Sequence, residues 1–140
     1  MPFRRTPLFF ASLWLPLALA LVAAAASAQT WDYKAWKRDK SGQYDRNSFA
    51  LGTLEVKEAG DGTATLRLAL PQTDACVRSA LPAKVERGDE TTIVTVTDIL
   101  AGCEKFRYVL RNDGSGGTRE VMRGGEWRSD GFDHGLTKQK

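Results

Sequence analysis

The feature that most constrains the fold is a series of short segments, between residues 49 and 130, in which apolar and polar side chains alternate. The alternation is clearest over residues 63–70 and 104–111. A period of two is typical of a strand with one buried face. Glycine-rich turn sequences such as Ala59-Gly60-Asp61-Gly62 and Gly124-Gly125 separate the segments. The pattern therefore predicts antiparallel strands joined by tight connections.

Two cysteines, Cys76 and Cys103, lie within this stretch, and the sequence contains no others. Two cysteines allow a single intramolecular pairing. Closing a loop of this length stabilises a small domain by about 3–4 kcal/mol in the chain-entropy model. We therefore predict a structural disulfide between them. A redox-active pair would more often be spaced as Cys-x-x-Cys.

The N-terminal segment predicts export. Arg4 and Arg5 precede an almost unbroken apolar run, and Ala26-Ser27-Ala28 fits the small-residue rule of signal peptidase. A retained membrane anchor is the competing interpretation, because the run approaches the length that spans a bilayer. Pro16 and the small residues at the end of the run favour cleavage after Ala28. We therefore expect a periplasmic or secreted protein with no membrane span after cleavage.

The charge of the exported chain is close to neutral. The sequence has 20 Lys and Arg against 17 Asp and Glu, and removing Arg4 and Arg5 leaves 18 basic residues. Such a balance provides no general attraction to nucleic acid or to an anionic membrane surface. We therefore expect neither as a partner.

The chain divides into four predicted parts: a signal peptide over 1–28, an N-terminal aromatic and charged arm over 29–48, a β-domain over 49–130 and a C-terminal tail over 131–140. The β-domain is predicted to be all-β, with six to seven strands in a small antiparallel meander. Such a meander either rolls into a barrel or folds as a sandwich. At this size we expect one domain and a monomer.

The register of the last strands is predicted from their apolar residues. We place Met122 and Trp127 on the same face as Phe106, because a slip of one residue would expose Met122. This register leaves Val109 and Val121 on the outer face.

The N-terminal arm concentrates aromatic residues, namely Trp31, Tyr33 and Trp36. These residues could form an aromatic platform for a sugar or a peptide. Alternatively they plug one end of the β-core, and this second interpretation is favoured because aromatic rings dominate the cores of small domains.

Residues able to perform catalysis or bind metal are sparse. His134 is the only histidine of the chain and stands in the predicted tail, with Asp130 and Asp133 close by in sequence. Most nucleophilic triads need a histidine held on a rigid element. The spacing of these three residues matches no rigid metal-binding frame, and Asp and Gly here are typical of a turn. We therefore expect no metal, no cofactor and no enzymatic activity.

The remaining functional signal is a set of arginines in the last three predicted strands. In the chosen register they share the outer face of the sheet. They are Arg107, Arg111, Arg119, Arg123 and Arg128. Arginine makes planar, bidentate contacts to carboxylate, sulfate and phosphate. The competing interpretation is a solvated face whose arginines pair with Glu126 and Asp130.

These observations predict a non-enzymatic binding or inhibitor module of the cell envelope, with an arginine-rich face for an anionic partner. The partner would be an envelope protein or an anionic glycan. The alternative function is a carrier of a small apolar or glycan ligand that uses the aromatic arm.

Overall fold

The protein folds into one curled antiparallel sheet of nine strands that forms a half-barrel. The structure, a computed structural model, describes residues 26–38, 41, 43–69, 75–77, 79–130 and 134–140. The strands are β1 (Ser27–Arg38), β2 (Tyr44–Glu58), β3 (Thr63–Ala69), β4 (Leu81–Arg87), β5 (Thr91–Val96), β6 (Phe106–Arg111), β7 (Gly117–Arg123), β8 (Glu126–Ser129) and β9 (His134–Lys138). One 3₁₀ turn, η1 (Ala75–Val77), precedes β4. The all-β prediction is confirmed.

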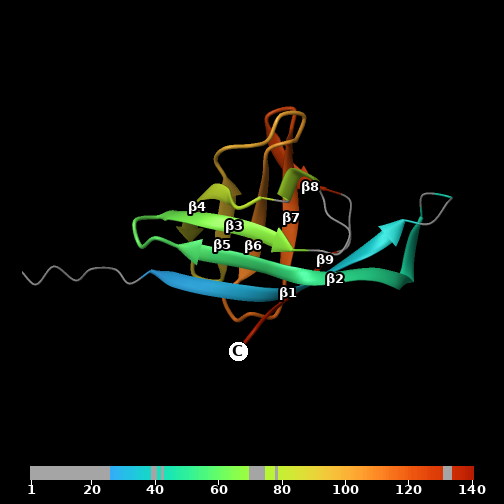
Figure 1. The fold of residues 1–140 in the computed structure, drawn as a ribbon, viewed down its shortest axis with the longest axis horizontal. Coiled ribbons are helices and arrows are strands. Elements are labelled where there is room, and N and C mark those ends of the chain that lie inside the picture. Colours follow the sequence, from blue (N-terminus) through green and yellow to red (C-terminus); the bar gives the residue numbers. More distant parts are fainter. Residues whose placement is uncertain (1–25, 39–40, 42, 70–74, 78, 131–133) are drawn as a thin grey trace, which may run out of the picture.

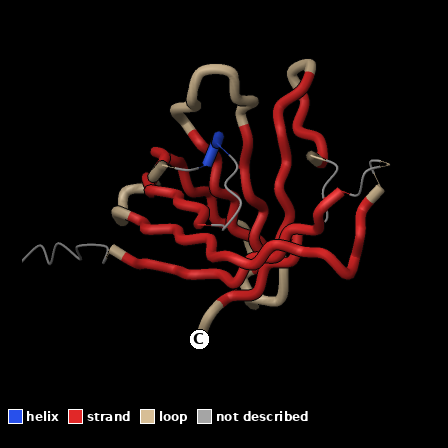
Figure 2. The backbone as a smooth tube through the Cα atoms, turned by 45° about the vertical axis from the view of Figure 1, so that its right-hand side comes forward, coloured by secondary structure: helices blue, strands red, loops and turns tan. Residues whose placement is uncertain are grey.

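The strand order is β8-β7-β6-β5-β4-β3-β2-β1-β9, so the chain is a meander until its last strand returns to pair with β1. In Figure 1, β1, β2 and β3 run across the view, whereas β7 runs nearly perpendicular to them. Figure 2 shows the same curl, with the single helical turn near the strand ends. β9 also lies beside β7, which brings the two ends of the sheet toward each other. The Lys138 amide donates to the Gly114 carbonyl across this closure at 3.0 Å.

The core lies on the concave side of the sheet. In β3, buried residues alternate strictly with exposed ones, and β5 and β6 follow the same period. This is the pattern that the alternating sequence predicts. The largest fully buried side chains are Trp31, Tyr33, Tyr108, Phe106, Leu54, Leu66 and Leu110.

The sheet has nine strands instead of the six to seven predicted, because β1 and β9 lie outside the predicted β-domain. The predicted arm forms most of β1, which pairs with β2 and β9. The segment predicted to be a C-terminal tail contains β9. Both strands belong to the sheet because Trp31, Tyr33 and Leu136 are each only 2% exposed.

The predicted register of β7 is also wrong, by one residue. Phe106 is opposite Val121, which is buried, whereas Met122 is opposite Trp127 on the outer face. Gly117 explains why Val121 instead of Met122 faces the core. It lies opposite Leu110, and a Cβ atom there would be 2.9 Å from Leu110 Cδ2. The inward-facing position at the start of β7 therefore suits only glycine, and residues 119 and 121 follow it inward.

The predicted disulfide is confirmed. Cys76 in η1 is bonded to Cys103, with 5.7 Å between their Cα atoms. The bond ties the segment before β4 to the connection between β5 and β6. The part of the chain that the structure describes contains no helix with the length and apolar character that crossing a bilayer requires.

Candidate functional site

The structure divides the five predicted arginines between different environments. Arg107 and Arg111 share the outer face of β6 with Val109. Arg119 points to the concave side, because it lies opposite Tyr108. Arg123 and Arg128 have the same parity as Arg119 but lie near the β7–β8 hairpin, beyond the core. A single arginine face is therefore not formed.

Arg107 is held by its neighbours on the outer face. Its Nε donates to Glu120 Oε2 at 2.5 Å, and its guanidinium lies 4.4 Å from the centroid of the Trp127 ring. These contacts neutralise the charge and bury part of it. Arg111 lies at the other end of β6, where its side chain is exposed.

Arg119 is part of the interior. Its guanidinium lies 4.5 Å from the centroid of the Phe106 ring and 4.0 Å from Asp130 Oδ2. The side chains of Arg119 and Asp130 are only 13% and 5% exposed. A partner in solution therefore has little access to this guanidinium.

Arg123 and Arg128 remain at the surface, with side chains 51% and 62% exposed. Arg123 donates from Nε and Nη2 to the two carboxylate oxygens of Glu104, at 2.8 and 2.9 Å. This hydrogen bonding lowers the pKa of Glu104 and raises the pKa of Arg123. Arg128 Nη2 donates to Glu126 Oε2 at 2.9 Å. These two arginines, which we call the arginine hairpin, lie on the strands that flank the turn at Gly124-Gly125.

The three N-terminal aromatic residues do not form a platform. Trp31 and Tyr33 point into the core. Trp36 has the opposite parity and packs over β9, where a Cβ atom at Gly135 would lie 3.3 Å from its ring. The core role that the sequence favoured is thus the one the structure places on Trp31 and Tyr33.

His134 joins the two ends of the sheet. A hydrogen bond links its Nδ1 to the Tyr33 hydroxyl, and a second, of 2.6 Å, links its Nε2 to Asp130 Oδ2. The side chains of His134 and Asp130 are each 5% exposed. Tyr33, His134, Asp130 and Arg119 form what we call the buried cluster. Sequence analysis noted His134 and Asp130 but missed Tyr33 and Arg119 as their neighbours, because only the return of β9 to β1 brings Tyr33 to His134.

The buried cluster has the connectivity of a hydrogen-bonded triad, but its environment does not suit catalysis. Burial, followed by the field of Tyr108, raises the pKa of Tyr33 far above its ordinary value. The hydroxyl therefore stays protonated and is a poor nucleophile. Among the described residues, no group of three or more His, Cys, Asp or Glu side chains is arranged to hold a metal ion. Asp133 lies outside them.

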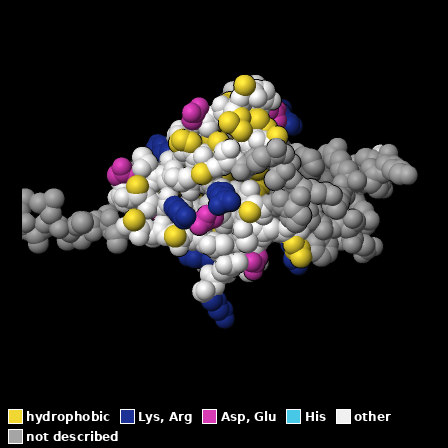
Figure 3. Space-filling model, viewed as in Figure 1, with side chains coloured by type: hydrophobic (Ala, Val, Ile, Leu, Met, Phe, Trp, Pro, Cys, Tyr) yellow, Lys and Arg dark blue, Asp and Glu magenta, His cyan; other side chains and the backbone are white. Residues whose placement is uncertain are grey.

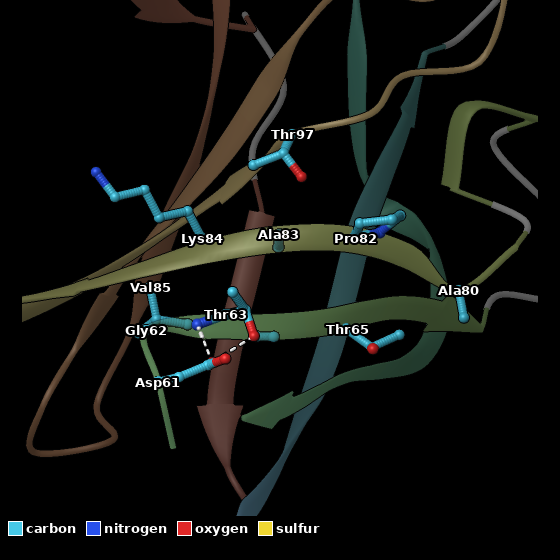
Figure 4. Close-up of a pocket in the computed structure, with 11 residues that line it drawn as sticks. Asp61, Gly62, Thr63, Thr65, Ala80, Pro82, Ala83, Lys84, Val85 and Thr97 are labelled. Carbon is cyan, nitrogen blue, oxygen red and sulfur yellow. Dashed lines mark hydrogen bonds between the residues drawn. The ribbon is translucent and has the colours of Figure 1, made fainter. Parts of the chain in front are cut away.

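A shallow hollow of about 640 Å³ lies between β3 and β4 (Figure 4). The residues around it are small, including Thr65, Ala80 and Pro82, and all three are exposed. Its two charged side chains are already engaged, since Asp61 accepts from the Thr63 amide at 2.9 Å and Lys84 Nζ donates to Glu86 Oε1 at 3.0 Å. Its lining residues include no aromatic side chain. The hollow therefore provides neither a stacking surface nor converging charges for a ligand.

The connection between β5 and β6, residues 97–105, is a feature that sequence analysis did not single out. Ile99 and Leu100 at its tip are each 39% exposed. Leu51 is the other large apolar side chain that is exposed among the described residues. The signal in the sequence was the apolar run Ile99-Leu100-Ala101, bounded by Asp98 and Gly102. We call residues 97–105 the apolar loop.

The chain matches no protein-family model, and comparisons with curated proteins and with solved structures find no significant match.

Proposed function

We propose that the protein is an exported, non-enzymatic binding module, of inhibitor or adaptor kind, that recognises an anionic partner of the cell envelope. The observation that carries the proposal is the arginine hairpin. Its two guanidinium groups are exposed, planar and held in place by surface carboxylates. A guanidinium in this setting is suited to bidentate contact with a carboxylate, sulfate or phosphate group.

The existing ion pairs do not prevent such a contact. Exposed ion pairs contribute little to folding, because water screens them and side-chain ordering offsets the attraction. A carboxylate of a partner can therefore replace Glu104 or Glu126 at little cost to the fold. The attraction between the guanidinium and the partner's carboxylate also becomes stronger when water is excluded between the two surfaces.

Two of the other predicted arginines, Arg107 and Arg119, are assigned to the fold. Arg119 supports the core, and Arg107 stacks on Trp127 within the outer face. Binding rather than catalysis is supported by the burial of His134 and Tyr33, because a catalytic group must reach its substrate. The sheet supplies a rigid frame that presents the hairpin at little entropic cost.

Capture of a partner tests the proposal. The disulfide-bonded protein, immobilised, is incubated with envelope extract, and bound proteins are identified by mass spectrometry at low and high salt. We expect a protein that is lost at high salt and lost with the double substitution Arg123→Glu and Arg128→Glu.

A matched control has Lys57→Glu and Lys84→Glu. These lysines are 62% and 61% exposed and are also paired with surface carboxylates. The control makes the same change in net charge away from the hairpin. Equal capture by both double variants would contradict the proposal, and binding of anionic glycans alone would change the class of the partner.

A further inference from the structure

The C-terminal end of the apolar loop is joined to the arginine hairpin by side-chain and backbone hydrogen bonds. Glu104, within the loop, is the carboxylate that holds Arg123. The amide of Met122, next to Arg123 in β7, donates to the carbonyl of Lys105 at 2.8 Å. Two segments that are distant in sequence thus present their side chains together. Figure 3 shows apolar side chains gathered at the end of the molecule where the β7–β8 hairpin projects.

The apolar loop is braced along its length. The disulfide from Cys103 anchors it to η1, and the Cys103 amide donates to the Leu100 carbonyl at 3.1 Å. At its start the Thr97 amide donates to the Pro82 carbonyl at 2.9 Å. A braced loop loses little conformational entropy when a partner binds it. Two adjacent apolar side chains on such a loop are suited to act as anchors.

The shape and charge of this end restrict what can cover it. The apolar loop extends beyond the strands at the top of Figure 1, so a partner must offer an apolar pocket to enclose Ile99 and Leu100. The charged residues within segments 97–105 and 122–129 balance, three acidic against three basic, which provides no net attraction to an anionic bilayer. They are Asp98, Glu104, Glu126, Lys105, Arg123 and Arg128.

We propose that Ile99 and Leu100 insert into an apolar pocket of a folded protein partner whose rim carries carboxylates, and that these carboxylates pair with Arg123 and Arg128. The inference rests on the proposed function, and it names the chemistry of the partner and the residues that anchor it. Insertion of the tip removes both apolar side chains from water, while the rim pairs orient the complex.

Photo-crosslinking identifies the partner. A photo-crosslinking amino acid is placed at position 100 or, as a control, at position 51, where Leu51 is 55% exposed. Both proteins are irradiated in intact cells that produce them. We expect one protein to be cross-linked from position 100 and not from position 51. Equal labelling from both positions, or none from position 100, would overturn the inference.

The cross-linked protein is then purified, and its affinity is measured by titration calorimetry. Ile99→Ser with Leu100→Ser is expected to weaken binding at least about 30-fold, as hot-spot anchors do. Leu100→Ser alone should give an intermediate loss, and Leu51→Ser should give none. Because all three side chains are exposed, the variants should keep the circular dichroism and the disulfide of the parent.

The arginine substitutions and the serine substitutions test the two proposals separately. Binding that is lost with the arginine substitutions but unchanged by the serine substitutions would overturn the apolar anchor and leave the proposed function standing. Binding that survives both pairs of substitutions would overturn both proposals. Sedimentation of the protein with phosphatidylglycerol vesicles, or concentration-dependent dimerisation, would overturn the inference if either depended on Ile99 and Leu100.

Discussion

The buried cluster and the arginine hairpin use the same chemistry in two environments. In each, an arginine lies beside a carboxylate, Arg119 beside Asp130 and Arg123 beside Glu104. The first pair is almost sealed from solvent, and its carboxylate also holds His134. The second pair is about half exposed. The comparison teaches that burial, rather than residue type, decides whether such a pair supports the fold or is available to a partner.

The largest difference between the two regions is expected when one carboxylate is removed from each. Asp130→Ala removes the buried carboxylate beside Arg119, together with the hydrogen bond from Asp130 to His134. We expect it to lower the free energy of unfolding by about 3–5 kcal/mol. Glu104→Ala leaves Arg123 in water and should change stability little. Urea denaturation of both variants measures the difference, and similar losses would contradict the assignment.

Removal of the disulfide separates the two regions in a second way. Cys76→Ala with Cys103→Ala is expected to lower the free energy of unfolding by about 2–4 kcal/mol. In the folded fraction, amide hydrogen exchange should accelerate over the apolar loop and remain slow in β6 and β9. Uniform acceleration over both strands and the loop would show that the bond braces the whole sheet instead.

The register of β7, which places Arg119 inside, depends on Gly117. Gly117→Ala puts a Cβ atom 2.9 Å from Leu110 Cδ2 and 3.0 Å from Leu136 Cδ1. We expect a loss of about 1–3 kcal/mol in thermal or urea unfolding, as for other overpacked sites. Gly116→Ala is the control, since the nearest atom there is 3.7 Å away. A neutral Gly117→Ala would mean that another contact sets the register.

The smallest expected effect is a change in the pKa of Glu104, which pairs with Arg123 of the arginine hairpin. Hydrogen bonding from Arg123 lowers the pKa of Glu104. A carboxyl group whose pKa is depressed by folding stabilises the fold at neutral pH, and that contribution is lost as the pH falls through its folded pKa. Carbon-detected NMR titration should find the Glu104 pKa below its ordinary value, and Arg123→Ala should restore it. Unchanged titration in the variant would show that the pair does not persist in solution.

The parts of the fold that were predictable from the sequence are those governed by local pattern. Alternation over β3 and β6 marked strands with one buried face, and the pairing of Cys76 with Cys103 followed from there being only two cysteines. The edges of the sheet were not predictable in this way. β9 contains a single buried apolar residue, Leu136, between polar neighbours and glycine, so it carries no alternation of its own.

The candidate site was predictable only in part. The arginine-rich strands could be recognised in the sequence. The face that each arginine of β7 occupies, however, depends on Gly117, whose neighbours lie in β6 and β9. The predicted register placed Met122 instead of Val121 on the inner face. Both residues are apolar, so the hydrophobic pattern alone cannot choose between them. The buried cluster joins residues up to 101 positions apart in the chain, and no local pattern encodes that contact.

Capture of an envelope partner by the two charge-reversed double variants tests the division between the regions most directly. If the arginine hairpin is the binding surface, Arg123→Glu with Arg128→Glu loses the partner. Lys57→Glu with Lys84→Glu, which makes the same change in net charge, then retains it. Capture that is the same for both variants would contradict the assignment of the arginine hairpin as the binding surface.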